Sequence, residues 1–471
     1  MLTVYMTVYM EKFKKKYIGD RAFYKMLFAV AIPIMIQNGI TNFVGMLDNL
    51  MVGRLGTEPM SGVSIVNQIM FVYYLCVFGG LAGAGIFTAQ YFGSGDEEGI
   101  RNTFRYKLWL AATLSVLAIL VMLTAGDNLI GLFLNESEGG GDLAATLRYG
   151  RGYMNIILLG IPFFCISNVY ASSMRECGET IVPMRAGVIA VFVNLVFNYL
   201  LIFGKFGFPR LGVYGAAAAT DISRIFEMLI LVIWLHSHTD RFPFAEGLYR
   251  TLKVPVRTVK KIFVTGTPML VNEAFWSTGF FLLNQAYSTR GLNVVAANGI
   301  ASTIYNVFSI AFIALGDSVA ILIGRLLGAG KMKEAKETDT RIIAFSVMIG
   351  TVLTVMMLVT APFFPRLYNT SSEVRHLATM FLVVQAFFAP KEAFLNTTYF
   401  TIRSGGRTVV TFFFDSVFMC VVSVPLAFYL TRFTALHVIV IFAIVNAADM
   451  IKCTIGYILV RKNVWMRNIV T

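Results

Sequence analysis

Residues 26–47 read MLFAVAIPIMIQNGITNFVGML and contain no charged side chain. A helix needs about 20 mostly apolar residues to cross a hydrocarbon core about 30 Å thick, so this run predicts a membrane-spanning helix. The run is longer than the apolar part of a signal peptide and lacks a small-residue cleavage site. We therefore expect Met26–Leu47 to stay in the membrane as part of the first helix.

The composition of the whole chain agrees with this interpretation. Of 471 residues, 57% are hydrophobic and only 14% are charged, whereas about 25% of a soluble domain is charged. So few charges exclude a soluble domain of this length, a disordered chain and a coiled coil. The net charge of +13 fits basic cytoplasmic loops and predicts no binding to nucleic acid. The five cysteines have no zinc or CxxC spacing, so we expect neither disulfides nor metal thiolates.

Twelve apolar runs are long enough to span a bilayer, and no segment alternates as the strands of a membrane barrel do. The sequence therefore predicts an all-α, polytopic membrane protein. The expected spans are residues 24–50, 62–92, 104–125, 151–172, 183–204, 212–236, 261–289, 295–327, 341–363, 377–401, 408–430 and 434–460.

The basic residues orient these spans. If both termini lie in the cytoplasm, 27 of the 39 Lys and Arg residues fall in cytoplasmic segments and nine in external ones. An excess of Lys and Arg in cytoplasmic loops is the usual topology signal. We therefore expect a multi-pass protein of the cell (plasma) membrane with both termini in the cytoplasm.

An internal duplication relates the two halves. A shift of 235 residues aligns Pro33 with Pro268, and a shift of 228 aligns Arg175 with Arg403. The difference fits a longer loop around Gly139–Gly141 in the first half. Two sets of six helices begin on the same side, so the repeats are parallel, with a pseudo-two-fold axis along the membrane normal. Such paired lobes predict alternating access by rocking around a central cavity.

The duplication also sets the expected domains. These are an N-terminal tail at 1–23, a six-helix lobe at 24–236, a cytoplasmic linker at 237–260, a second six-helix lobe at 261–461 and a C-terminal tail at 462–471. Residues 3–10 repeat TVYM in tandem. We expect either a biological start at Met10 or a disordered tail there.

Several motifs occur in a fixed order along the chain. They are Met46-Leu47-Asp48, Val52-Gly53-Arg54-Leu55-Gly56, Gln90-Tyr91-Phe92-Gly93-Ser94-Gly95-Asp96, Met174-Arg175-Glu176-Cys177-Gly178-Glu179-Thr180 and Asn194-Leu195-Val196-Phe197-Asn198. With these motifs, the chain resembles the multidrug and toxic compound extrusion (MATE) family of cation-coupled antiporters from about Tyr24 to Arg461. The pair Asn194 and Asn198, followed by Gly204-Lys205-Phe206-Gly207, is most similar to the NorM-like branch. Another branch carries aspartate at the position of Asn198.

Ionisable groups inside a bilayer are costly and mark ion or substrate pathways. The resemblance implies that Asp48 in the first helix binds a proton or a cation and so controls drug release. It also implies that Glu273 and Glu392 form a cation site in the second half, which would take Na⁺ or H⁺. The sodium-binding branch often has a tyrosine four residues before the tenth-helix acid. Phe388 stands there in this chain, so a hydroxyl ligand for Na⁺ is missing.

Amides also occur within the spans. Asn194 and Asn198 are four residues apart and therefore share one face of a helix. They are expected either to join Asp48 in a polar site or to hydrogen-bond a neighbouring helix. We group them with Gln37 and Lys391 as polar residues of the transport cavity.

The partners of the other buried charges are predicted from helix geometry. Neighbours in sequence do not face each other on a helix, so Lys391 need not pair with Glu392, and its partner stays open between Glu273, Asp317 and the membrane interface. Opposite charges three residues apart do share a face. We therefore expect two pairs within their own helices, Asp221 with Arg224 and Asp449 with Lys452.

The leading hypothesis for function is a secondary antiporter that exports organic cations in exchange for Na⁺ or H⁺, as a monomer and without a cofactor. Aromatic faces attract organic cations, and the chain has 41 Phe and 20 Tyr. The alternative is a lipid-linked oligosaccharide flippase of the same superfamily, although those proteins commonly have more than twelve helices. The sequence has no Walker A, HExxH or GxSxG motif, so we expect neither ATP-driven transport nor an enzyme.

Overall fold

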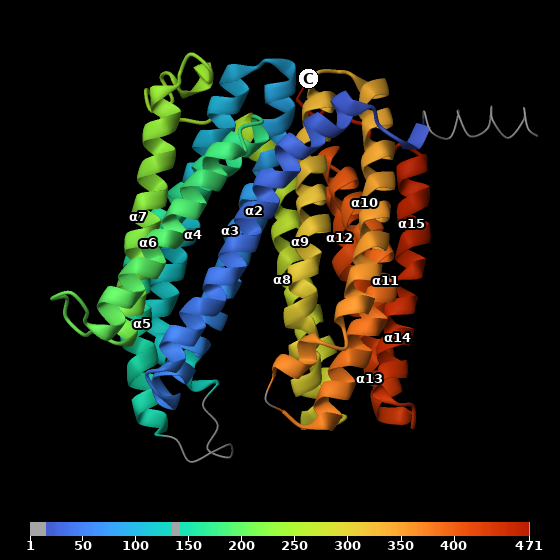
Figure 1. Ribbon diagram of the computed structural model, residues 1–471. Coiled ribbons are helices and arrows are strands. Elements are labelled where there is room, and N and C mark those ends of the chain that lie inside the picture. Colours follow the sequence, from blue (N-terminus) through green and yellow to red (C-terminus); the bar gives the residue numbers. More distant parts are fainter. Residues whose placement is uncertain (1–15, 134–141, 369, 471) are drawn as a thin grey trace, which may run out of the picture. The chain divides into compact units, whose positions relative to one another are not determined.

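The computed structural model describes residues 16–133, 142–368 and 370–470, and of Leu292 only the backbone. Within these ranges every regular element is a helix, and no strand occurs (Figure 1). The prediction of an all-α fold is therefore confirmed. Met10 and the loop at Gly139–Gly141 lie outside the described residues, so the expectations for them are not tested.

The first half of the chain forms six long helices, which are α2 (Arg21–Gly53), α3 (Thr57–Ser94), α4 (Glu97–Gly131), α5 (Leu143–Glu176), α6 (Ile181–Phe203) and α7 (Val213–Ser237). A linker with one short turn, η1 (Pro243–Ala245), follows. The second half begins with four helices, α8 (Val256–Ser288), α9 (Leu292–Gly328), α10 (Met332–Thr360) and α11 (Ser372–Ser404), with η2 (Phe364–Leu367) before the last.

The last two spans of the described chain are interrupted. The eleventh is built from α12 (Thr408–Phe412), two π-helical turns, η3 (Phe413–Val417) and η4 (Met419–Ser423), and α13 (Val424–Phe433). The twelfth consists of α14 (Val438–Ala448) and α15 (Met450–Arg461). π-helical turns occur frequently at functional sites, and both interruptions lie next to buried charges.

Corresponding helices of the two halves begin at corresponding positions. Helices α2, α3 and α4 begin at residues 21, 57 and 97, and α8, α9 and α10 begin 235 residues later, at 256, 292 and 332. The first turns of α4 and α10 are polar, so the hydropathy pattern places their starts too late, at 104 and 341. Asp96 caps α4, because its carboxylate accepts a hydrogen bond from the Gly99 backbone N–H at 2.9 Å.

Ten of the described helical spans are long and apolar enough to cross a membrane. The other two long helices are α7 and α8. Helix α7 carries Asp221, Arg224 and Glu227, and α8 carries Glu273 in a stretch with several other polar residues. The two long helices that are less apolar, α7 and α8, therefore hold a large share of the intramembrane charges.

The chain divides into two compact units. The N unit comprises Ile36–Thr88 and Asp96–Gly266, and the C unit comprises Met1–Met35, Ala89–Gly95 and Thr267–Thr471. The start of α2 belongs to the C unit because its apolar side chains are buried there. Leu27 and Ile34 lie in one hydrophobic cluster with Leu322 of α9 and with Trp465, which follows α15.

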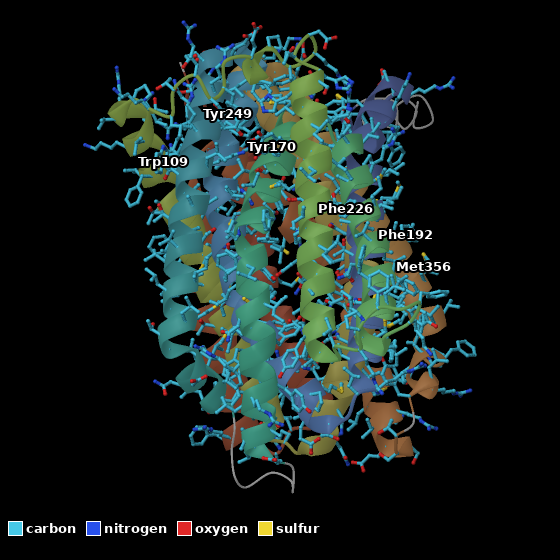
Figure 2. The ribbon with its side chains drawn as sticks, turned by 90° about the vertical axis from the view of Figure 1, so that its left-hand side faces the viewer. Trp109, Tyr170, Phe192, Phe226, Tyr249 and Met356 are labelled. Atoms are coloured by element: carbon cyan, nitrogen blue, oxygen red, sulfur yellow. The ribbon has the colours of Figure 1, made fainter. Side chains whose placement is uncertain are left out.

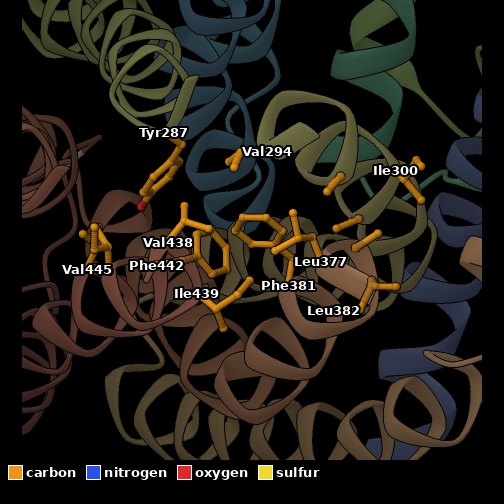
Figure 3. Close-up of a cluster of buried hydrophobic side chains, with 14 of the residues drawn as sticks. Tyr287, Val294, Ile300, Leu377, Phe381, Leu382, Val438, Ile439, Phe442 and Val445 are labelled. Carbon is orange, nitrogen blue, oxygen red and sulfur yellow. The ribbon is translucent and has the colours of Figure 1, made fainter. Parts of the chain in front are cut away.

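A second hydrophobic cluster forms the larger part of the C-unit core (Figure 3). It joins residues of α8, α9, α10, α11, α13 and α14. Phe442 lies at its centre, with ring centroids 4.9 Å from Phe381 and 5.5 Å from Tyr287, both in edge-to-face geometry. This packing fixes α11 against α14, the two helices that carry Lys391 and the break at Asp449.

In the N unit, α7 packs against α5 and α6. A Cβ atom on Gly215 would lie 2.6 Å from the Leu201 backbone, so glycine at this position allows α6 and α7 to approach closely. Large apolar side chains such as Trp109, Phe192 and Phe226 are exposed on the helices of this unit (Figure 2). This outward apolar surface is what a helix bundle in lipid requires.

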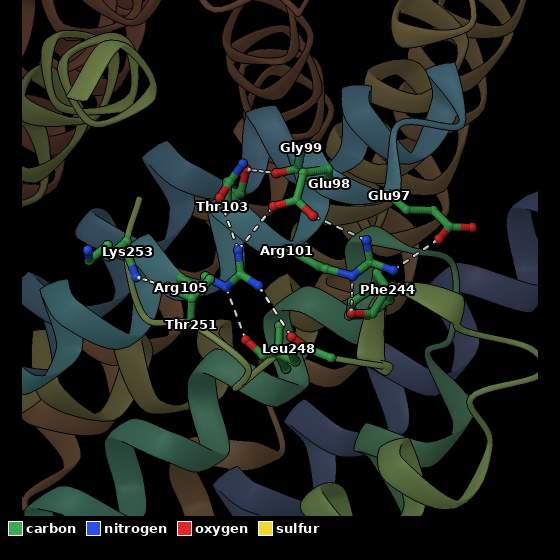
Figure 4. Close-up of polar contacts among 12 residues, drawn as sticks. Glu97, Glu98, Gly99, Arg101, Thr103, Arg105, Phe244, Leu248, Thr251 and Lys253 are labelled. Atoms are coloured by element: carbon green, nitrogen blue, oxygen red, sulfur yellow. Dashed lines mark hydrogen bonds and ion pairs between the residues drawn. The ribbon is translucent and has the colours of Figure 1, made fainter. Parts of the chain in front are cut away.

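The linker is bound to the start of α4 (Figure 4). Arg101 donates to the backbone carbonyl of Phe244 at 3.2 Å, and Arg105 donates to that of Leu248 at 3.0 Å. Glu98 pairs with both arginines. The guanidinium groups thus satisfy carbonyls that have no secondary-structure partner, and the linker packs onto the N unit.

Candidate functional site

A polar cluster in the N unit joins α2, α6 and α7. Asp48 and Asn198 each lie five residues before the end of their helices, and Asn198 Nδ2 donates to Asp48 Oδ1 at 2.6 Å. Asn198 is 1% exposed, and Asp48 is half-buried. A hydrogen bond to an ionised carboxylate is stronger than one between neutral groups, so this contact holds α2 to α6.

Asn194 is the second amide of this cluster. Its side-chain amide lies 3.0 Å from both carboxylate oxygens of Asp48 and 3.0 Å from Asn198 Nδ2. In the first orientation, the Asn194 carbonyl oxygen accepts a hydrogen bond from Asn198 Nδ2 but also faces the carboxylate of Asp48, which is a second acceptor. In the second orientation, the Asn194 NH₂ group donates to the carboxylate of Asp48 but also faces the NH₂ group of Asn198, which is a second donor. A proton on Asp48 removes the conflict in the first orientation, because a protonated carboxyl donates to a carbonyl oxygen.

Thr220 on α7 completes the cluster, since its hydroxyl accepts a hydrogen bond from Asn194 Nδ2 at 3.3 Å in the first orientation. Thr220 was not predicted from the sequence, because a threonine in a helix normally donates to its own backbone, and Thr220 also donates to the carbonyl of Ala216. The spacing of Asn194 and Asn198 was the available signal, and it pointed to a shared helix face but not to a partner.

Gln37 lies elsewhere in the N unit. It precedes Asp48 by eleven residues on α2, a rise of about 16 Å along the helix. Its carbonyl oxygen accepts a hydrogen bond from Arg175 of α5 at 3.3 Å, and its amide packs against Gly187 of α6. The structure therefore does not bring Gln37 together with Asp48.

The expected pairing within α7 is wrong in its partner. Arg224 forms its ion pair with Glu227, three residues later, at 2.9 Å, and not with Asp221. Its guanidinium also lies 5.3 Å from the centroid of Phe164. Asp221 lies against α5, where a Cβ atom on Gly160 would come within 1.9 Å of its carboxylate. Both acids are three residues from Arg224, so spacing alone did not show that Glu227 is the partner.

Lys391 of α11 is the centre of a charge cluster in the C unit. Its Nζ atom lies 2.7 Å from Glu392 Oε1 and 3.2 Å from Asp449 Oδ2. The pairing with Glu392 was not expected, but both side chains are long enough to bend toward each other. The sequence left the partner of Lys391 open, and its ion pairs in the described residues are with Glu392 and Asp449.

The expected pair of Asp449 with Lys452 is also wrong. Lys452 instead binds Asp415 of η3 at 2.9 Å, and Asp449 binds Lys391. Lys452 Nζ also lies 5.6 Å from the centroid of Phe414. Asp449 and Lys452 each have a closer partner on another element, Lys391 of α11 and Asp415 of η3.

Glu273 of α8 is a further acid of the C unit. It is near the charges of Arg403 and Asp415. The preceding residue, Asn272, accepts a hydrogen bond from Ser416 of η3 at 2.8 Å through its side chain and donates one to the Tyr399 hydroxyl at 3.2 Å. Glu273 and Glu392 thus have different polar partners, and the shared cation site of these two residues stays a prediction.

No group of three or more His, Cys, Asp or Glu side chains in the described ranges has the geometry to hold a metal ion. The two polar sites instead consist of carboxylates, amides and amines within membrane-spanning helices. Groups of this kind bind and release small ions or pair with one another. The fold and these sites are those expected of a helical membrane transporter.

Comparison with known proteins identifies the family. The MatE family model matches residues 33–200 and 268–429, once in each half of the chain, and the chain belongs to this family. Its relatives include the probable multidrug resistance protein NorM of Thermotoga maritima. The two chains are 27% identical over 419 residues, which cover 87% of this chain and 86% of that protein. The multidrug resistance protein PmpM of Pseudomonas aeruginosa is 27% identical over 83% of this chain and 80% of that protein.

Solved structures show the same fold. A multidrug resistance MATE family transporter in an outward-facing conformation matches with a TM-score of 0.82 at 21% identity, covering 94% of this chain and 96% of that one. A mutant of the Vibrio cholerae MATE transporter VcmN matches with a TM-score of 0.84 at 17% identity, covering 94% and 98%. The predicted resemblance to the MATE family and its NorM-like members is confirmed.

Proposed function

We propose that this protein is a secondary antiporter that exports amphipathic organic cations in exchange for Na⁺ or H⁺ by alternating access. Its family makes it a multidrug efflux transporter, and it is not an enzyme. The relatives are named multidrug resistance proteins. The proposal adds the driving ion, the charge of the substrate and the residues that couple them.

The single observation that carries the proposal is the cluster of Asp48, Asn194 and Asn198. Asp48 lies within a membrane-spanning helix, where a bare carboxylate is costly. The described side chains within hydrogen-bonding reach of it are neutral amides. Such a carboxylate is poised to take up a proton or a monovalent cation, and the Asn194 amide favours a bound proton because it then has a donor to face.

The substrate class follows from the interior chemistry. The N-unit cluster would gain or lose one charge as it exchanges an ion, so a cationic substrate can compete with that ion. Aromatic faces attract organic cations, and Met side chains adapt to ligands of varied shape. The chain supplies 41 Phe, 20 Tyr and 23 Met.

The environment of the protein is part of the proposal. We place it in the cell membrane as a monomer with both termini and the 237–260 linker in the cytoplasm. The distribution of 27 Lys and Arg against nine supports this orientation. Small organic molecules and the lipid bilayer are its partners.

The test uses purified protein in liposomes with an imposed pH gradient or Na⁺ gradient and ethidium as the organic cation. The proposal predicts that one of these gradients drives ethidium uphill and that Asp48→Asn abolishes this transport. Ethidium movement that is equal with and without both gradients would refute antiport. The same assay with a lipid-linked sugar in place of ethidium tests the alternative flippase activity.

A further inference from the structure

The environment of Lys391 resembles a site for a monovalent cation. Its side chain is 5% exposed, and its Nζ atom lies 2.7 Å from Glu392 Oε1, 3.2 Å from Asp449 Oδ2 and 3.1 Å from the backbone carbonyl of Asn446. The ring of Phe388 lies on a fourth side, 5.0 Å from Nζ. An ammonium group has three N–H donors, and three oxygen acceptors surround it here.

The carbonyl of Asn446 is available because the twelfth span breaks. Helix α14 ends at Ala448, and α15 begins at Met450. The last carbonyls of a helix lack a partner in the helix and carry a partial negative charge. Interrupted helices of transporters use such carbonyls to coordinate coupling ions. In this chain, the ammonium of Lys391 lies at the position that such an ion would take.

The backbone of α11 holds Lys391 in this place. Pro390 has no N–H group, so the carbonyl of Ala386 four residues earlier loses its partner in the helix. Thr354 of α10 donates to that carbonyl at 2.6 Å. A Cβ atom on Gly350 would lie 2.7 Å from Pro390 Cα, so α10 packs directly against this turn. Two contacts from α10 therefore fix the backbone of α11 next to Lys391.

The lysine belongs to a chain of alternating charges. Glu392, Lys391 and Asp449 are joined by ion pairs, and Lys452 and Asp415 by another. Lys452 also lies within electrostatic range of Asp449, so the two pairs form one series. Every carboxylate in this series has a lysine next to it, and Lys391 alone is shared by two of them, Glu392 and Asp449. The three carboxylates exceed the two lysines by one negative charge.

We propose that Lys391 is a tethered cation that fills the ion site beside Glu392, so that Na⁺ does not bind there and Glu392 does not exchange an ion during transport. Lys391 thereby determines which ion the C unit accepts. The inference rests on the proposed function for its relevance to coupling, but ion binding can be measured without transport. It also competes with the shared Na⁺ site at Glu273 and Glu392, and one experiment separates the two.

The experiment measures the melting temperature of the purified full-length protein in NaCl and in choline chloride at equal ionic strength. We expect the same Na⁺ response for the wild type and for Glu392→Gln, because Na⁺ does not reach that carboxylate. Lys391→Met removes the ammonium and keeps much of the side-chain volume. It should gain a saturable upward shift with Na⁺ that is lost again in the double variant with Glu392→Gln.

Two matched variants serve as controls. Lys391→Arg keeps the charge and should gain no Na⁺ response. Lys452→Met removes another buried lysine of the same unit, which forms its ion pair with Asp415, and should not gain the response of Lys391→Met. An equal gain in Lys452→Met would show a general effect of lost charge and overturn the proposal.

Two other outcomes would also overturn it. One is a wild-type Na⁺ response that Glu392→Gln abolishes, which would support the shared site. The other is a folded Lys391→Met variant that does not respond to Na⁺. If Lys391→Met does not fold, the comparison of wild type with Glu392→Gln decides alone. Failure of ethidium transport would refute the antiport proposal and leave these binding results unchanged.

Discussion

Asp48→Asn should abolish coupled export while leaving the protein folded. The substitution keeps the size of the side chain and one acceptor for Asn198 Nδ2, which now donates to Asp48 at 2.6 Å. A hydrogen bond to a charged group contributes about 1.5–3 kcal/mol and a neutral one about 0.5–1.5 kcal/mol. The expected loss of stability is therefore about 1–2 kcal/mol, or about 1–2 °C in Tm for a chain of this length.

The functional effect should be much larger, because an amide cannot exchange a proton. A tenfold proton gradient stores about 1.4 kcal/mol and, at one proton per drug, sustains a tenfold ethidium gradient. The wild type in liposomes should approach this ratio, whereas Asp48→Asn should stay near equal concentrations. The readouts are ethidium fluorescence and Tm of the same preparation.

A matched control separates the role of Asp48 from the loss of any carboxylate. Asp221→Asn removes another half-buried acid of the N unit, one that has no described hydrogen bond to Asn194 or Asn198. It should keep coupled transport. Gradient-driven accumulation at the wild-type level by well-folded Asp48→Asn would remove Asp48 from the mechanism. Equal loss in both variants would show that the effect is not specific to the cluster.

Three further outcomes are expected. Single cysteines at the two termini and in the 237–260 linker, in a background without native cysteines, should resist impermeant thiol reagents in intact cells; labelling at any of them would contradict the topology. Thr354→Val should lower the stability by about 1–3 kcal/mol, because a buried carbonyl of α11 loses its donor. Thr351→Val is the control and should have little effect on Tm, because the described hydrogen bond of the Thr351 hydroxyl is to the Val347 carbonyl of its own helix. Gly405→Ala should displace the segment around Trp465, since a Cβ atom would lie 1.7 Å from the Trp465 carbonyl oxygen. Unchanged protease resistance of the C-terminal segment in that variant would be inconsistent with this packing.

The number and type of the helices could be predicted because lipid leaves the chain little choice. Every backbone N–H and C=O group in a bilayer must be satisfied within the protein, which leaves helices or closed barrels. Apolar runs of about 20 residues then predict each span. The duplication could be read at the level of single residues, and the starts of three helix pairs confirm its shift of 235.

The candidate N-unit site was partly predictable. Asp48 stands out as a charge within an apolar helix, and the i, i+4 spacing of Asn194 and Asn198 indicates one face. Their mutual contact depends on how α2 lies against α6, which no local pattern encodes. Thr220 gave no signal, because its hydroxyl also has a partner in its own helix.

The ion pairs could not be predicted from spacing. An i, i+3 pattern allows a pair but does not exclude a closer partner on another helix, and Lys391 and Lys452 both take such partners. The repeat also gives no guidance here, because a shift of 228 places Phe164 opposite Glu392, and a shift of 235 places Leu283 opposite Asp48. The two halves share their fold and some charges, such as Arg175 and Arg403, but the acids Asp48 and Glu392 have no charged counterpart.

The sequence by itself determined the membrane location, the helical class, the duplication and the residues that carry charge into the bilayer. These properties follow from local hydropathy and from the periodicity of the chain. Only the tertiary structure decided which charges meet, because an electrostatic contact depends on distances of 3 Å between helices far apart in sequence. The break at Asp449 and the fixed turn at Pro390 bring Lys391 between two carboxylates, and neither the strength of that contact nor its effect on ion binding is encoded in any one segment.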